Sequence, residues 1–108
     1  MLNLSKMQNF ETRSISAENF TGEKGKGGMS IDGTAASCAR ELGQGWKVSP
    51  YIIANYNEEI VLADIKGPGC INHIWITDSS EFDRQLILRI YYDDSDKPSV
   101  EAPLGDFF

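Results

Sequence analysis

The chain has 108 residues, 41% hydrophobic and 24% charged, which suits one small folded domain and excludes disorder throughout. A formal net charge of −6, with ten scattered Lys and Arg, excludes a general nucleic-acid or anionic-membrane surface. No apolar run reaches membrane-spanning length, and the first residues lack the apolar core of a signal peptide. Two distant cysteines, Cys38 and Cys70, favour free thiols, so the sequence predicts a soluble cytoplasmic protein.

The first half of the sequence predicts little regular structure. Residues 1–12 have weak helical spacing and predict a short helix or arm, set apart from residues 13–108, and residues 13–17 alternate like a short strand. Four glycines between residues 21 and 28 predict a loop, because backbone entropy opposes regular structure there. A turn of helix is expected at residues 36–42, ended by Gly43.

From Trp46 onward the pattern indicates β-structure. We expect a hairpin at residues 59–77, with a type II turn that places Pro68 and Gly69 at its second and third positions. On its second strand, Ile71, His73 and Trp75 would share one face. The further strands are expected at residues 46–49, 85–92 and 99–102, with a loop at 93–98.

These strands have apolar faces that require a second layer, and little sequence follows them to supply one. The last residues, Phe107 and Phe108, are large aromatics with no polar tail after them. The sequence therefore predicts a mainly β fold: an incomplete jelly roll or β-sandwich that forms the first part of a larger domain.

The glycine loop does not fit a nucleotide-binding motif. A P-loop needs Lys and Ser or Thr after its last glycine, whereas Gly28 and Met29 follow Gly27 here. Two interpretations remain open: a plain flexible loop, or a backbone that approaches a ligand or a neighbouring subunit, with Lys24 and Lys26 as donors.

No catalytic set or metal site is apparent. His73 is the single histidine, and the Asp-rich loop at residues 93–98 lacks the glycine and terminal Glu of an EF-hand, so no metal and no cofactor are expected. Among the carboxylates, Asp64 and Asp106 have apolar neighbours and should be paired or perturbed. The aromatics of the strands have rings that could stack on a sugar, but they are expected mostly in the core; they are Trp46, Tyr51, Trp75, Tyr91 and Tyr92.

Four blocks, in order and spacing, resemble glycoside hydrolase family 172, formerly domain of unknown function 2961. The blocks are SAENFTGEKGKGG (16–28), GQGWKVSP (43–50), ADIKGPGCINHIWIT (63–77) and PLGDFF (103–108). The resemblance implies tandem jelly rolls assembled as trimers or hexamers. It also implies retaining cleavage or transfer of α-linked furanosides, such as α-D-fructofuranose dianhydrides and α-D-arabinofuranosides.

In that family the two catalytic glutamates lie downstream of the matched blocks, so no catalytic residue is assigned and the chain is expected to be inactive alone. The matched blocks are expected to form part of a sugar pocket. Glu18 and Asn19 would bind hydroxyl groups, Trp75 would stack on the sugar, and Lys24 and Asp106 would add polar contacts. His73 and Asp64 are interpreted as structural.

Three functional hypotheses remain open from the sequence. The chain is a truncated or split glycosidase, a non-catalytic carbohydrate-binding or assembly module built on the same sandwich, or a gene fragment without a function of its own.

Overall fold

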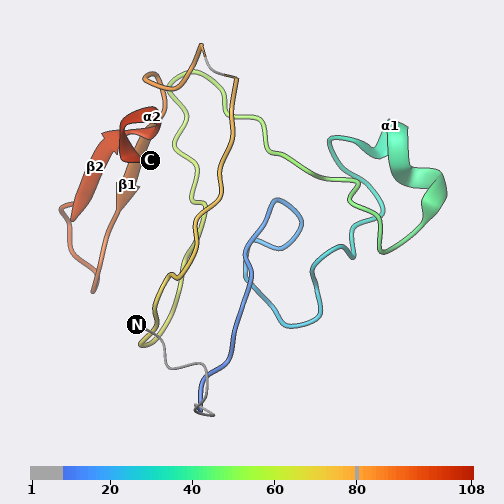
Figure 1. Cartoon of the computed structure of the whole chain (residues 1–108), viewed down its shortest axis with the longest axis horizontal. Coiled ribbons are helices and arrows are strands. Elements are labelled where there is room, and N and C mark those ends of the chain that lie inside the picture. Colours follow the sequence, from blue (N-terminus) through green and yellow to red (C-terminus); the bar gives the residue numbers. More distant parts are fainter. Residues whose placement is uncertain (1–8, 80) are drawn as a thin grey trace. The chain divides into compact units, whose positions relative to one another are not determined.

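The computed structural model describes residues 9–79 and 81–108 (Figure 1). The described residues divide into two compact units, a first that ends at Gly69 and a second from Cys70 to Phe108. Most described residues lie outside helices, and the one regular sheet among them has two strands. This agrees with a mainly β chain that contains little helix. The jelly roll, and the division at residue 12, stay predictions.

The helical turn in the first unit is confirmed. It consists of α1 (Ala36–Ala39) followed by the 3₁₀ turn η1 (Arg40–Leu42). Gly43 follows at once with a φ of 75°, the left-handed conformation that commonly ends a helix. The local pattern of small residues and a terminating glycine was therefore sufficient to locate this element.

The small core of the first unit forms where residues 33–36 meet residues 48–49. The Ala35 backbone N–H donates to the Val48 carbonyl at 2.8 Å, and Val48 and Ala36 are buried. Gly33 lies against Ser49 so closely that a Cβ there would come within 2.4 Å of the Ser49 Cβ. The strand expected at residues 46–49 is not formed, because this segment bonds to residue 35 rather than to a neighbouring strand.

The N-terminal expectations are corrected in part. Residues 1–8 lie outside the described part, residues 9–12 are not helical, and no strand forms at residues 13–17. Instead, Ser16 and Asn19 form an isolated antiparallel bridge. The glycine loop that follows is confirmed, with Gly22, Gly25 and Gly28 at φ between 63° and 77°.

The hairpin expected at residues 59–77 is wrong. Neither residues 59–66 of the first unit nor residues 70–77 of the second form a strand. The residue with positive φ is Gly67, at 84°, and not Gly69, so the type II turn is wrong as well. A two-stranded ribbon is marginal without a covered apolar face, and Ile65, Ile71 and Trp75 remain exposed here.

The two later strands are confirmed with shifted ends. In the second unit β1 (Ile87–Ile90) lies antiparallel beside β2 (Val100–Pro103) (Figure 1). In the register of this pair, Arg89 is opposite Glu101. The Arg89 Nε donates to Glu101 Oε2 at 2.6 Å across the ladder. Burial alternates as predicted for β1, because every second residue of the strand is half-buried.

A short helix after β2 was not predicted. It is α2 (Leu104–Phe107). The first backbone N–H groups of this helix donate hydrogen bonds to carbonyl groups of the turn before β1. Leu104 N donates to the Leu86 carbonyl at 2.8 Å, and Gly105 N donates to the Asp83 carbonyl at 2.9 Å. The rings of Phe107 and Phe108 meet edge to face with centroids 5.1 Å apart.

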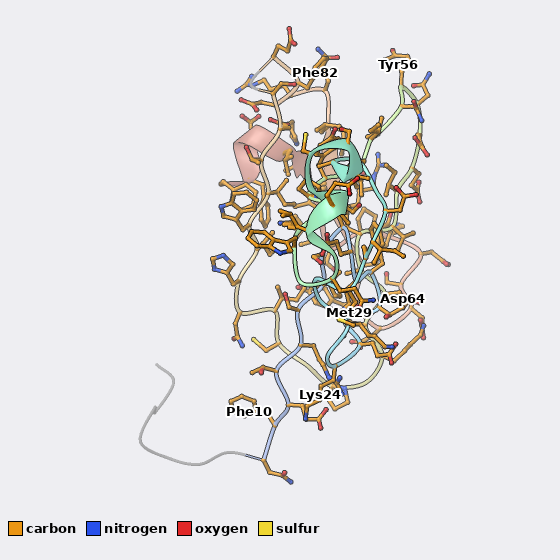
Figure 2. The ribbon with its side chains drawn as sticks, turned by 90° about the vertical axis from the view of Figure 1, so that its right-hand side faces the viewer. Phe10, Lys24, Met29, Tyr56, Asp64 and Phe82 are labelled. Atoms are coloured by element: carbon orange, nitrogen blue, oxygen red, sulfur yellow. The ribbon has the colours of Figure 1, made fainter. Side chains whose placement is uncertain are left out.

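Many large apolar side chains are exposed within the described residues, including Phe10, Tyr56 and Phe82 (Figure 2). The expectation that the strand aromatics lie mostly in the core is therefore wrong, because no facing layer covers them among the described residues. These aromatics are Trp46, Tyr51, Trp75, Tyr91 and Tyr92, and each is about half exposed or more.

Replacing Gly33 with alanine is expected to loosen the small core of the first unit. The new Cβ would lie 2.4 Å from the Ser49 Cβ and 3.0 Å from its Cα, and overpacking of this kind costs about 1–3 kcal/mol. The measurement is hydrogen exchange at the Ala35 amide, which should become faster. Gly27→Ala is the control, because a Cβ on Gly27 has nothing within 4 Å. Equal exchange in both variants would contradict the expectation.

Candidate functional site

Asn19 organises the loop that contains three of the five predicted sugar contacts. Its Nδ2 donates to the carbonyls of Glu23 at 3.0 Å and Ser14 at 3.4 Å, and its Oδ1 accepts from the Glu23 backbone N–H at 3.1 Å. The residue is buried. Asparagine suits this position because its amide replaces backbone partners on both sides of a turn. The loop therefore uses both functional groups of this side chain.

Glu18 fixes the same loop to a distant segment. Its Oε1 accepts a hydrogen bond from the Ser49 backbone N–H at 2.8 Å, across 31 positions of sequence. The side chain is half-buried, and a carboxylate that accepts from a backbone N–H makes a stronger bond than a neutral acceptor. Glu18 thus positions the loop beside the small core formed by Val48 and Ala36.

Beneath the glycine loop is a hollow of about 180 Å³ that is lined by polar residues and glycines. Lys24 is exposed at this hollow, and a Cβ on Gly25 or Gly27 would have nothing within 4 Å. Open space beside backbone N–H groups and an ammonium group is suited to polar oxygens of a ligand. The lining residues are Thr12, Arg13, Ser14, Ser16, Asn19, Gly22, Glu23, Lys24, Gly25 and Gly27.

The remaining two predicted contacts belong to the second unit. The Trp75 side chain is 72% exposed, so its indole face is accessible to a flat ligand surface. Asp106 Oδ1 accepts from Arg84 Nη2 at 2.8 Å in an exposed ion pair. The structure therefore brings Glu18, Asn19 and Lys24 together in one loop and places the other two in different segments of the second unit.

A pair of carboxyl groups that the sequence did not predict as a site lies in the second unit. Asp78 and Asp83 line a hollow of about 210 Å³ together with Ile76, Gly105 and Phe108. The pKa of Asp78 is raised, mainly by a hydrogen bond with the Asp83 carboxyl, then by desolvation and by the Asp83 charge. The sequence feature that could have indicated this pair is two aspartates five positions apart at a turn.

Other candidates are placed outside any assembled site. His73 is exposed, and Asp64 is exposed and pairs with Lys66 Nζ at 3.0 Å. Within residues 9–79 and 81–108, no group of three or more His, Cys, Asp or Glu is arranged to hold a metal ion. Cys38 and Cys70 are exposed free thiols, and the described helices include none with the length and apolar character needed to cross a membrane.

Removing the Glu18 carboxylate is expected to release residue 49 from the loop. Glu18→Ala should accelerate hydrogen exchange at the Ser49 amide by about tenfold, because a charge-assisted hydrogen bond contributes about 1.5 kcal/mol or more. Glu18→Gln keeps an acceptor oxygen and should show a smaller increase. Glu41→Ala, at an exposed site on η1, is the control. Unchanged Ser49 exchange in Glu18→Ala would contradict the positioning role.

Comparison with known proteins gives one family match. Residues 37–108 match the family described as GH172 first beta-sandwich domain, which includes Trp75 and Asp106 but not Glu18, Asn19 or Lys24. No curated protein matches the chain. Because the match spans about two thirds of the sequence, the chain belongs to glycoside hydrolase family 172, with residues 37–108 corresponding to its first β-sandwich domain.

Proposed function

We propose that the chain binds α-linked furanosides, such as α-D-arabinofuranosides and α-D-fructofuranose dianhydrides, as part of a retaining glycosidase. The observation that supports this proposal is the family match over residues 37–108. Assembly as trimers or hexamers, expected from the family resemblance, belongs to the same proposal.

Binding, rather than cleavage, is the role that the described residues support. A retaining glycosidase needs two carboxyl groups about 5–5.5 Å apart across the scissile bond. Of the residues that line the hollow beneath the glycine loop, Glu23 alone has a carboxylate. The nearby Glu18 carboxylate already accepts from the Ser49 backbone N–H. We therefore assign no catalytic residue, and the chain would contribute a wall of the sugar site.

The contacts differ in how free they are to meet a ligand. Lys24 has an exposed ammonium group at the hollow, whereas the amide of Asn19 is engaged by its own loop. Asn19 and Glu18 would therefore shape the site, and Lys24 would make the direct hydroxyl contact. In the second unit Trp75 offers its exposed ring, and Asp106 offers the carboxylate oxygen that is not held by Arg84.

Lys24→Ala is expected to weaken binding of methyl α-arabinofuranoside about tenfold, because the variant loses a hydrogen bond from a charged donor. Titration of the full chain by NMR would measure the dissociation constant. Lys47→Ala is the matched control, since Lys47 is exposed in the same unit but does not line the hollow.

Equal weakening in both lysine variants would show that only overall charge matters and would contradict the Lys24 contact. Absence of furanoside binding by the unaltered chain would contradict the proposed function. Hydrolysis of an aryl α-arabinofuranoside by this chain, abolished in Glu18→Gln, would contradict the assignment of a binding role.

Trp75 is expected to report furanoside binding to the second unit through its fluorescence. The chain has two tryptophans, so Trp46→Phe leaves Trp75 as the only one, and furanoside stacking should change its emission. The reverse variant, Trp75→Phe, should bind several times more weakly and show no such change from Trp46. A signal that follows Trp46 and not Trp75 would transfer the stacking role to the first unit.

A further inference from the structure

Asp32 and Gly33 form a dipeptide whose chemistry the sugar site does not use. In the whole sequence this is the single place where an aspartate or an asparagine directly precedes a glycine. The carboxyl carbon of an aspartate and the backbone nitrogen of the next residue can close a five-membered imide ring. A side chain on that next residue obstructs the ring closure, and glycine has none. The sequence is therefore most permissive for this reaction at Asp32.

The structure holds the two reacting groups beside each other. The Gly33 backbone N–H donates to Asp32 Oδ1 at 3.0 Å. Because Oδ1 is bonded to the carboxyl carbon, this hydrogen bond keeps the Gly33 nitrogen next to the carbon that it would attack. Both residues are exposed, so water has access to the site. The folded backbone thus places nucleophile and electrophile together at the surface.

We propose that Asp32 is a site of spontaneous conversion to isoaspartate, and that the conversion loosens the small core of the first unit. This inference does not depend on sugar binding. It requires no enzyme and no cofactor, because the reacting groups belong to neighbouring residues and the other reactant is water.

The reaction has two balanced steps. The Gly33 nitrogen forms a bond to the Asp32 carboxyl carbon, and the nitrogen's proton and the carboxyl hydroxyl leave together as one water. Water then opens the imide. Cleavage of the new bond restores aspartate, whereas cleavage of the original peptide bond leaves the main chain running through the side-chain carbons. No group is oxidised or reduced, and the final product has the same mass as the starting chain.

The main chain at Gly33 has no room for an additional atom. A Cβ there would come within 2.4 Å of the Ser49 Cβ. The Gly33 carbonyl accepts from Ala36 N at 3.0 Å, and the Ala35 N–H donates to the Val48 carbonyl at 2.8 Å. Isoaspartate inserts one methylene group into the backbone directly before these contacts. Because a packed site accommodates extra atoms only by displacing its neighbours, the converted chain should not retain all of these contacts.

Peptide mapping of the full chain after prolonged incubation under mildly acidic conditions tests the site. Electron-transfer fragmentation distinguishes isoaspartate from aspartate, and the imide intermediate is lighter by one water. Conversion at Asp32 should be severalfold greater than at Asp94, which is also exposed but precedes Ser95. Asp32→Glu keeps the carboxylate but would need a six-membered ring, so conversion should disappear in this variant.

The same incubation in denaturing urea measures what the fold contributes. Since the folded backbone already holds the Gly33 nitrogen beside the carboxyl group, conversion of Asp32 in the folded chain should be at least as fast as in urea. Slower conversion in the folded chain would overturn the proposal. So would equal conversion at Asp32 and Asp94.

Hydrogen exchange tests the effect on the core. The converted chain, separated by ion-exchange chromatography, should exchange its Ala35 amide severalfold faster than the unconverted chain from the same sample, because the bond to the Val48 carbonyl is weakened. Equal protection of Ala35 in the two forms would overturn the link between conversion and the core.

Discussion

Coverage of apolar strand faces is the constraint on which this structure depends. A short ladder of two strands is marginally stable in water unless one face is covered. Residues 59–66 and 70–77 have the β-branched and aromatic composition of strands, yet Ile65, Ile71 and Trp75 are exposed and no ladder forms. β1 and β2 do form a ladder, and Leu88 and Ile90 on one face of β1 are half-buried. Composition therefore indicates which segments could form strands, and coverage of their apolar faces determines which of them do.

Where apolar burial is small, polar contacts hold the chain. In the first unit Val48 and Ala36 are the buried apolar residues among those described, and several hydrogen bonds surround them. Each such bond contributes only about 1 kcal/mol net, so none of them dominates. Glu18 and Asn19 are part of this set, because their side chains bond to backbone groups. Side chains that keep a loop in shape are less available to a ligand, which leaves Lys24 as the freer group at the hollow.

Features determined by neighbouring residues were predictable from the sequence. The helix ended by Gly43, the glycine loop and the strands near residues 87–90 and 100–103 follow from local chemistry. Two predictions, the core positions of the aromatics and the hairpin, required a facing layer. No local sequence pattern indicates whether such a layer is present. α2 and the pair formed by Asp78 and Asp83 depend on how a turn returns to the chain's last residues. The spacing of residues along the sequence does not specify how this turn folds back.

The candidate sites relate differently to the family. Residues 37–108 carry the family match, and they include Trp75 and the carboxyl pair, whereas the glycine loop with Lys24 precedes them. Family membership therefore supports the type of fold and says nothing direct about the loop. The loop depends instead on its own geometry, in which Asn19 and Glu18 hold the backbone while open space remains beside Gly25. Such a hollow, with a hydrogen-bonded backbone and the exposed ammonium group of Lys24, is suited to a hydroxyl-rich ligand, because a loop that is already ordered loses less entropy on binding.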